Sequence, residues 1–362
     1  MAEVNTQPID RYLRELADRG GTDLHITAGA PPLLRIDGQI HPVGDPALSA
    51  DGAEDLIHDV LPDDLWHRLV QDKEVDFAFD WAGAYRLRGN AFHTRAAPAM
   101  ALRLIPFEIP TFDELGIPPT VTGWCDLFQG LVLVTGPTGS GKSTTLAAMI
   151  DAINARRHAH ILTLEDPIEY VHNHKLSMVN QRELGTDCDS FARGLRSALR
   201  EDPDVVLVGE MRDPETIAAV LTIAETGHLV FSTLHTNDAG QSIDRIVDVF
   251  TAERQNQIRI QLAGSLVGVC SQRLLPRPRG GLVATFEVLV ATYAVRNLIR
   301  DGKSGQLRNQ IATGMQFGMS TLESSLSELV ARGFITWDEA LSHSLFPKEL
   351  VRPAGMPAVA VS

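Results

Sequence analysis

Cysteine is scarce in this chain, and its few cysteines stand far apart. Cys125, Cys188 and Cys270 are the only three among 362 residues, and no two of them form a C-x-x-C pair. This spacing provides neither a disulfide framework nor a four-cysteine zinc site. We therefore expect three buried thiols that behave as small hydrophobic groups in a reducing compartment.

Long apolar runs are also absent, although 44 % of the residues are hydrophobic. No stretch reaches the roughly 18 apolar residues that indicate a membrane-spanning helix. The first residues show no charged segment followed by an apolar one, as a secretory signal would. We expect a cytoplasmic protein that does not insert into the bilayer.

Positive charge is in short supply as well. The chain has 32 lysines and arginines against 46 aspartates and glutamates, which gives a net charge of −14. Such a charge opposes nonspecific binding to the phosphates of nucleic acid or of an anionic membrane. No basic stretch rich in aromatic residues, typical of proteins that bind single strands, is present either. We expect no nucleic-acid partner.

A glycine-rich loop that directly follows an apolar run is the most informative feature present. Residues 131–135 predict a buried strand, and a complete G-x-x-x-x-G-K-[ST] pattern follows them. The backbone N–H groups of such a loop and the start of the next helix bind phosphates, which predicts ATP binding. Lys142 is expected to reach the β- and γ-phosphates, and Ser143 to ligate Mg²⁺. The expected nucleotide-binding residues are Gly136, Pro137, Thr138, Gly139, Ser140, Gly141, Lys142, Ser143 and Thr144.

Strands and helices alternate after this loop. The patterns predict helices over 142–157 and 190–200 and strands over 160–165, 205–209 and 228–234. This order is typical of an α/β fold with a parallel sheet, in which ligands bind beyond the carboxyl ends of the strands. After about residue 290 the pattern becomes mostly helical.

Two of the predicted strands end in a carboxylate. Glu165 is a candidate catalytic base that orients or deprotonates the attacking water. Glu210 is a candidate for holding Mg²⁺ through its water shell. Either acid could instead cap the helix that follows it, which is the expected role of Asp166 and Glu169. Spacing alone does not decide which of the two acids is the base and which one holds the metal.

Two histidines bracket the strand predicted at 228–234. His228 stands at its start and His235 follows its end, about 23 Å away along an extended strand, so they cannot bind one metal ion together. His235 belongs at the nucleotide end, where a neutral histidine can detect the γ-phosphate and transmit its loss. The alternative for each is a purely structural role.

A smaller α+β region precedes the loop. A helical pattern over 49–71 begins at Ser49, an Asp37-Gly38 turn predicts a hairpin, and alternation at 75–79 predicts a half-buried strand. In the next strand Arg86 and Arg88 share the exposed face.

Prolines and glycines mark the boundary between this region and the larger one. We expect an N-terminal domain over 1–110, a linker over 111–123, an ATPase domain with a helical C-terminal part over 124–350, and a flexible tail over 351–362.

These motifs resemble those of the type IV pilus retraction ATPases, the PilT-like members of the type II/IV secretion ATPase superfamily. The resemblance runs from residues 22–32 through the loop to 294–300. It implies a RecA-like P-loop core with a smaller PAS-like N-terminal domain, assembled as a homohexamer. It also implies that Glu165 is the catalytic base, that Glu210 is the Walker B acid, and that the histidine pair is required.

The resemblance further implies that arginines of the N-terminal domain complete the active site of the adjacent subunit. Arg88, Arg95 and Arg103 fall in the corresponding stretch. A guanidinium can neutralise charge that develops on a transferred phosphoryl group. The alternative is that these arginines are solvated surface residues.

Residues 294–300, Ala-Val-Arg-Asn-Leu-Ile-Arg, resemble the sequence that marks the retraction type, with Val295 in place of isoleucine. Read alone, the segment predicts a packed surface helix. The resemblance implies a role in retraction but not in hydrolysis, which makes Arg296, Leu298, Ile299 and Arg300 candidate coupling residues. The lack of a tetracysteine zinc element sets the chain apart from assembly and secretion relatives.

The expected function is that of a Mg²⁺-dependent ATPase that converts hydrolysis into mechanical work at the base of a pilus machine. It would lie at the inner face of the cytoplasmic membrane and act on an inner-membrane platform protein. Three alternatives stay open: a pilus-assembly or type II secretion ATPase, a nucleic-acid translocase, and a regulatory protein that binds ATP without hydrolysing it.

Overall fold

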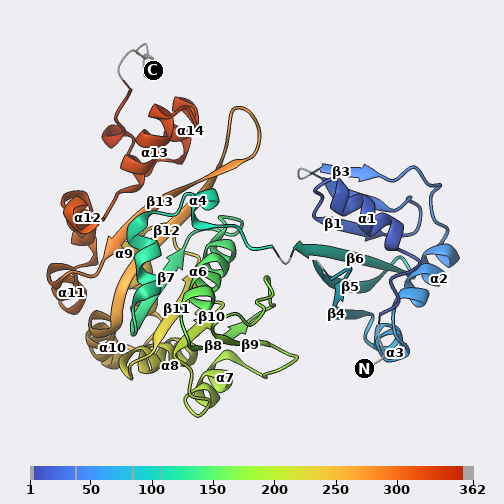
Figure 1. Cartoon of the computed structure of the whole chain (residues 1–362), viewed down its shortest axis with the longest axis horizontal. Coiled ribbons are helices and arrows are strands. Elements are labelled where there is room, and N and C mark those ends of the chain that lie inside the picture. The colour runs from blue at the N-terminus through green and yellow to red at the C-terminus, as the bar shows by residue number, and fades with distance from the viewer. Residues whose placement is uncertain (1–3, 37–38, 84, 107, 354–362) are drawn as a thin grey trace. The chain divides into compact units, whose positions relative to one another are not determined.

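The computed structural model divides the chain into two compact units, Met1–Glu108 and Ile109–Ser362 (Figure 1). The structure describes residues 4–36, 39–83, 85–106 and 108–353. The predicted Asp37-Gly38 turn and most of the predicted tail lie outside these residues.

The N-terminal unit is an antiparallel six-stranded sheet with strand order β3-β2-β1-β6-β5-β4. Its helices pack their apolar side chains against one face, where Leu24, Leu87 and Leu102 are fully buried. The elements are α1 (Asp10–Asp18), β1 (Asp23–Ile26), β2 (Leu33–Ile36), β3 (Gln39–Pro42), α2 (Ala50–Val60), α3 (Asp63–Asp72), β4 (Glu74–Trp81), β5 (Tyr85–Thr94) and β6 (Ala97–Pro106).

The helix predicted over 49–71 is in fact two helices, α2 and α3. Ser49 caps α2 as expected, since its side chain accepts a hydrogen bond from the backbone N–H of Gly52 at 3.0 Å. The break falls at Pro62, which has no N–H for an intrahelical hydrogen bond and starts the second helix as its N-cap.

The larger unit contains a seven-stranded sheet with strand order β13-β12-β7-β11-β10-β8-β9. All neighbouring strands are parallel except β12 and β13, so the predicted parallel sheet is confirmed. The strands are β7 (Gly130–Thr135), β8 (His160–Glu165), β9 (Met178–Glu183), β10 (Val205–Val208), β11 (Leu229–Leu234), β12 (Leu266–Pro276) and β13 (Leu282–Val290).

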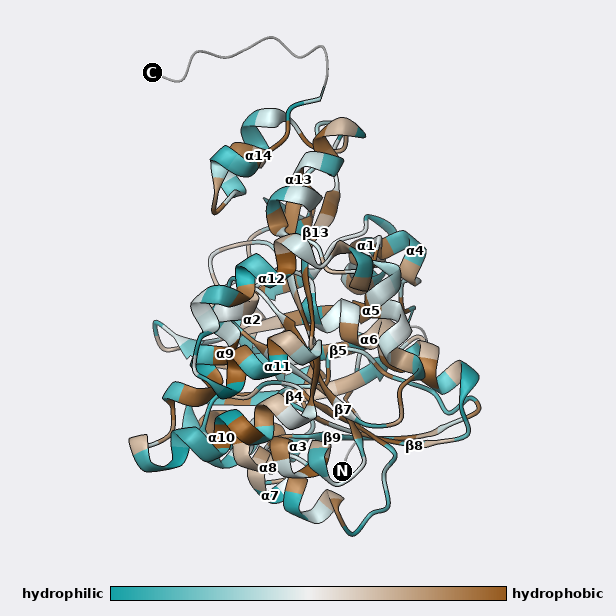
Figure 2. Ribbon diagram, turned by 90° about the vertical axis from the view of Figure 1, so that its left-hand side faces the viewer, coloured by the Kyte–Doolittle hydropathy of each residue, from teal (hydrophilic) through white to brown (hydrophobic). Residues whose placement is uncertain are grey.

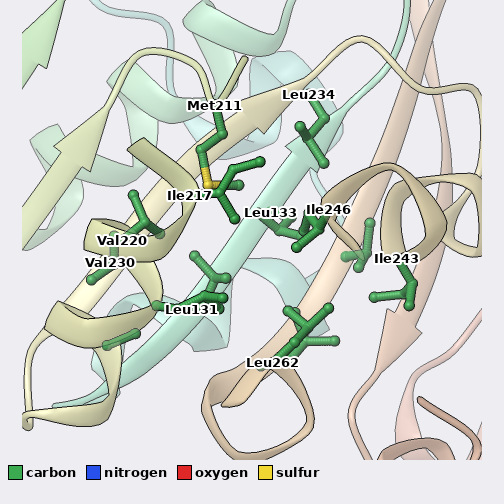
Figure 3. Packing of buried hydrophobic residues seen from close by; sticks show 14 of the residues in the cluster. Leu131, Leu133, Met211, Ile217, Val220, Val230, Leu234, Ile243, Ile246 and Leu262 are labelled. Atoms are coloured by element: carbon green, nitrogen blue, oxygen red, sulfur yellow. The ribbon is translucent and has the colours of Figure 1, made fainter. Parts of the chain in front are cut away.

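Both faces of this sheet are buried, as parallel sheets require. Alternate residues of β7 enter opposite cores: Val132 packs on the side of α6, whereas Leu131 and Leu133 pack on the side of α8 and α9 (Figure 3). In Figure 2 the core strands are largely brown, while the surrounding helices alternate between brown and teal. The helices are α6 (Lys142–Arg156), α7 (Phe191–Ala198), α8 (Pro214–Glu225), α9 (Ala239–Asp248) and α10 (Ala252–Ser265).

The segment predicted as a linker, 111–123, instead folds onto the larger unit. It forms α4 (Phe112–Leu115), α5 (Pro119–Gly123) and then η1 (Trp124–Asp126). Thr111 and Glu114 cap α4 reciprocally, and Val121 is fully buried in the core beneath α6. The prolines and glycines that suggested a flexible segment therefore start and stop short helices.

The C-terminal part is mostly helical, as predicted. It comprises α11 (Tyr293–Arg300), η2 (Ser304–Gln306), α12 (Leu307–Thr313), η3 (Met315–Phe317), α13 (Leu322–Ala331), α14 (Trp337–His343) and η4 (Pro347–Glu349). Buried Glu323 accepts hydrogen bonds from the Arg308 guanidinium at 2.9 Å and from the backbone N–H groups of Leu345 and Phe346. No helix in the described part of the chain has the length and apolar character needed to span a bilayer.

The cysteines only partly follow the expectation. Cys125 and Cys270 are buried, and burial raises the pKa of each thiol to about 12. Cys188 is only partly buried, so the expectation of three buried thiols is wrong for this residue. It lies in a loop at the edge of the sheet, beyond β9, where less of the protein covers it.

Candidate active site

The loop between β7 and α6 has the backbone conformation that only glycine adopts easily. Gly136, Gly139 and Gly141 have φ values of 142°, 79° and 84°. A Cβ atom on Gly136 would lie 2.2 Å from the carbonyl oxygen of Gln272, and one on Gly141 would lie 2.9 Å from the Gln272 side-chain nitrogen. The loop therefore has the curved backbone that phosphate binding needs, and it packs closely against β12.

Lys142 is folded back onto this loop. Its side chain is buried, and its Nζ donates to the carbonyl oxygens of Gly136 at 2.8 Å and Pro137 at 3.0 Å. Burial lowers the pKa of the ammonium group, and the charges of Glu169 and Glu210 partly oppose that shift. A phosphate group would offer this buried cation a better partner than two carbonyl oxygens.

Ser140 adds a second feature to the same loop. Its Oγ is buried and has no hydrogen-bond partner among the residues that the structure describes. Buried hydroxyls are normally satisfied, so an unpaired one inside a phosphate loop fits a site that binds a polar ligand.

Glu210 and His235 meet at a cavity of about 660 Å³ that also exposes the loop residues Pro137 and Thr138. Their strands, β10 and β11, are parallel neighbours, so their carboxyl ends lie at one edge of the sheet. The Oε2 atom of Glu210 lies 2.7 Å from Arg212 Nε and 3.4 Å from His235 Nε2. The structure thus brings together the loop, the second acid and the second histidine.

Glu165 ends β8 in a different setting. Its Oε1 atom accepts hydrogen bonds from Thr163 Oγ1 at 2.6 Å and from Gln181 Nε2 at 3.2 Å. Burial raises the pKa of the carboxyl to about 7, and these two bonds and a backbone N–H of Glu169 limit the rise. The nearby Glu169 carboxylate raises it further. A carboxyl with such a pKa is suited to accept a proton near neutral pH.

A chain of hydrogen bonds connects Glu165 to the loop. Gln181 Nε2 also donates to the carbonyl oxygen of Tyr170 at 2.8 Å. The Tyr170 hydroxyl in turn lies 3.0 Å from the Thr144 hydroxyl, next to Ser143 in the first turn of α6. The surroundings of Glu165 and the start of α6 are therefore held in a fixed relation.

His228 lies at the opposite end of β11 from the loop. Its Nδ1 is 3.1 Å from the Ile223 carbonyl oxygen and 3.1 Å from the Thr226 hydroxyl, and its own carbonyl accepts from the N–H of Gly130. Within one chain the structure does not bring His228 to the cavity. Its required role stays a prediction.

The three candidate arginines lie in the N-terminal unit, and all are exposed. Arg88 and Arg103 are cross-strand partners on β5 and β6, and Arg103 Nε donates to Asp23 at 2.8 Å. Arg95 stands in the turn between these strands with φ at 49°. The predicted exposed sheet face is thus present, and the role of these arginines in an adjacent site stays a prediction.

The predicted surface helix at 294–300 is α11. Ile299 is fully buried, and Leu298 packs at the edge of the core. The Arg296 guanidinium binds backbone carbonyl oxygens of Ala291 and Gly264, which ties α11 to the end of α10. Arg300 is exposed and donates to the Asn297 side chain at 3.2 Å. Of the coupling candidates, Arg300 and Leu298 are the most available to a partner.

Sequence reasoning missed Gln181, Thr163 and Gln272. Gln272 follows the residue paired with Thr135, so it lies beside the loop, where its Oε1 accepts from the buried Thr145 hydroxyl at 2.7 Å. The available signal was the polar Ser271-Gln272-Arg273 run inside an otherwise apolar strand.

Comparison with known proteins agrees with this geometry. Residues 3–279 match the family model for type II/IV secretion system proteins. This chain belongs to that family. Type IV pilus retraction ATPase PilT of Pseudomonas aeruginosa is 48 % identical over 94 % of the chain and 99 % of the relative. A twitching motility protein of Neisseria gonorrhoeae is 49 % identical over 85 % of this chain and 83 % of the relative.

A solved structure of the pilus retraction motor PilT with bound ADP superposes with a TM-score of 0.88 at 49 % identity. The match covers 94 % of this chain and 98 % of that one. The predicted resemblance to the PilT-like ATPases is therefore confirmed, as is the fold class, a RecA-like core with a smaller α+β N-terminal domain.

Proposed function

We propose that this chain is a Mg²⁺-dependent ATPase that works as a homohexamer and powers the retraction of type IV pili. The observation that carries the proposal is the convergence of four features on one edge of the sheet. The loop follows β7, His235 follows β11, Glu210 follows β10 and Glu165 ends β8, and these four strands are adjacent and parallel.

The loop would bind the phosphates of ATP. The N-terminus of α6 and backbone N–H groups of the loop would hold them, and Lys142 would exchange its two carbonyl partners for phosphate oxygens. The site's chemistry also fits Mg²⁺, because Ser143 and Glu210 supply the oxygen ligands that this ion prefers, the latter through water. The ion would stabilise charge on the phosphates.

Glu165 would act as the base. The attacking water oxygen bonds to the γ-phosphorus, the bond to the bridging oxygen of ADP breaks, and the water proton passes to the Glu165 carboxylate. The pKa of about 7 supports this assignment. Glu210 is less suited, because Arg212 and His235 already contact its Oε2 atom.

His235 would transmit loss of the γ-phosphate to α9. The Thr236 hydroxyl after it lies 2.7 Å from the Ser242 hydroxyl, and Asp238 caps α9 through the N–H of Gln241. A shift of His235 would therefore move the start of this helix.

The remaining roles lie between subunits. Arg88, Arg95 and Arg103 would complete the site of the adjacent protomer, and His228 would act there or in the strand itself. Arg296, Leu298, Ile299 and Arg300 on α11 would transmit the motion to an inner-membrane platform protein. The hexamer would lie at the inner face of the cytoplasmic membrane through these contacts.

The decisive experiment measures ATP hydrolysis and molecular mass of the full-length protein beside Lys142→Ala and Glu165→Gln. We expect a six-subunit wild type that hydrolyses ATP, a Lys142→Ala variant that fails to bind it, and a Glu165→Gln variant that binds without hydrolysis. An inactive wild-type hexamer would remove the basis of the motor proposal.

Retraction and assembly are separated in cells. Deleting a retraction ATPase leaves surplus pili, whereas deleting an assembly ATPase leaves none. Retraction is supported if cells that lack this protein carry surplus pili, and if a wild-type copy removes these pili whereas a Glu165→Gln copy does not.

A further inference from the structure

The carboxylate at the end of β8 is held by two side chains that belong to no motif described so far. Thr163 lies two residues before Glu165 on the same strand, and so on the same face of the sheet. Gln181 lies on the neighbouring strand β9, whose register pairs it with Thr163. Both side chains donate to the same atom, Oε1 of Glu165.

Gln181 has its hydrogen-bonding groups fully engaged. Its Nε2 donates to Glu165 and to the carbonyl oxygen of Tyr170, while its Oε1 accepts from the backbone N–H of His172 at 2.7 Å. The acceptor contact from His172 fixes which end of the carboxamide is nitrogen, so the end that meets Glu165 is the donor. Thr163 is fully buried, and its hydroxyl donates to Glu165.

We propose that Thr163 and Gln181 are positioning residues for Glu165, which together hold its Oε1 atom and leave its Oε2 atom directed to the attacking water. Neither would touch the nucleotide. The inference rests on the proposed role of Glu165 as the base.

The physical basis is that both contacts favour the ionised carboxylate. Burial favours the neutral form, and so does the Glu169 carboxylate, whereas the two side-chain donors and the backbone N–H of Glu169 favour the charged form. Without the donors, more of the base would be protonated at neutral pH and its carboxylate would be free to rotate. Two neutral donors achieve this without a salt bridge, which would lower the basicity too far.

Several carboxylates lie on the elements next to Glu165. Asp166 and Glu169 follow it in the loop, Glu183 is its register partner on β9, and Glu210 follows Gly209, which packs against the Glu165 backbone. Of these groups, Glu169 raises the pKa of Glu165. Thr163 and Gln181 therefore supply a stabilisation of the charged form that these carboxylates do not.

The test is the pH dependence of the single-turnover rate of ATP hydrolysis by the full-length protein with Mg²⁺. Thr163→Val removes one donor at nearly constant volume. We expect the midpoint of the acid limb to rise by about one unit, with a loss of roughly tenfold at pH 6.5 and near recovery at pH 9. Thr163→Ser, which restores the hydroxyl, should restore the wild-type profile.

Gln181→Met should move the midpoint in the same direction. It should also lower the plateau rate several-fold, because the Tyr170 carbonyl and the His172 N–H lose their partner as well. The affinity for ADP should stay at the wild-type value in Thr163→Val, since the hydroxyl of Thr163 contacts Glu165 and not the loop.

Thr285→Val is the matched control. Thr285 is also fully buried in this sheet, on β13, and its hydroxyl donates to Ser325 at 2.9 Å. This variant should lose about as much folding stability as Thr163→Val but keep the wild-type midpoint of the acid limb. A Thr163→Val profile that is merely lower at every pH, or a Thr285→Val midpoint that moves equally, overturns the inference.

Two further measurements separate this inference from the proposed function. If Glu165→Gln hydrolyses ATP at the wild-type rate, the base assignment itself is wrong. If Glu165→Gln is inactive and Thr163→Val leaves the midpoint in place, only the positioning role is wrong. The stability gained by Glu165→Gln should also be larger, and should level off at a higher pH, in a Thr163→Val background, which reports the pKa without any activity.

Discussion

The two acidic strand ends of the larger unit make an instructive contrast. At the end of β10, Glu210 is in contact with the Arg212 guanidinium and the His235 ring, beside a cavity of about 660 Å³. At the end of β8, Glu165 receives only neutral donors and has a pKa of about 7. Contacts with a guanidinium and an imidazole suit an acid that binds a metal's water shell, whereas a carboxyl held by neutral donors, with its pKa raised by burial, suits a proton acceptor.

The largest effect should come from removing the base. Glu165→Gln keeps the shape and an acceptor oxygen for Thr163 but cannot take a proton, so we expect hydrolysis to fall by about 10²–10⁴-fold. Single-turnover rates and ADP titrations measure this. Unchanged ADP affinity is the control. A loss of ADP affinity as large as the loss of rate would mean that Glu165 serves nucleotide binding and not proton transfer.

Removing the other acid should act on the metal instead. Glu210→Gln is expected to weaken the apparent affinity for Mg²⁺ by about 10–100-fold, because an outer ligand that orients bound water is lost. A Mg²⁺ titration of the ATPase rate measures it. High Mg²⁺ should restore much of the rate in this variant and none in Glu165→Gln. If high Mg²⁺ restored the rate of both variants equally, the distinction between a metal-binding acid and a base would be wrong.

The contrast should also be visible in stability. The pKa of Glu165 is higher in the folded chain than in the unfolded one, so the folded state holds the proton more tightly. The bound proton therefore contributes to the free energy of unfolding at low pH, and this contribution is lost as the pH rises through about 7. We expect Glu165→Gln to be more stable than wild type by about 1–3 kcal/mol at pH 8. The difference should shrink towards pH 5. Denaturant unfolding at both pH values measures it, and an equal gain at both would exclude the linkage.

The smallest effect is expected at Arg212. Its side chain is 72 % exposed although its Nε lies 2.7 Å from Glu210. Exposed ion pairs contribute little, so Arg212→Ala should change the free energy of unfolding by less than about 1 kcal/mol. The Mg²⁺ titration is the companion measurement. A loss of stability well above this bound would mean that the pair holds β10 in place.

Much of this site could be predicted because its signals are local. The need for glycine at positions 136, 139 and 141 is a property of the backbone at those residues, and their φ values have the expected sign. The acids and His235 were identifiable because each follows an apolar run, and parallel strands end at the same edge. The split of the 49–71 helix was also local, and Pro62 was its overlooked signal.

Other features could not be predicted because they depend on which strands become neighbours. Strand β12 lies beside β7 although more than a hundred residues separate them, and this places Gln272 against Gly136. The pairing of β8 with β9 likewise brings Gln181 to Glu165. The 111–123 segment was misjudged because its few apolar residues find their partners only on the folded core.

By itself the sequence determined that a phosphate loop exists, that the core is a parallel α/β sheet, and which acids end its strands, because backbone restrictions and hydrophobic periodicity belong to short segments. Only the tertiary structure decided how the two acids differ. That difference arises from the groups that surround each carboxylate, an arginine for Glu210 and neutral donors for Glu165, and the pKa of a carboxyl depends on what lies near it in space.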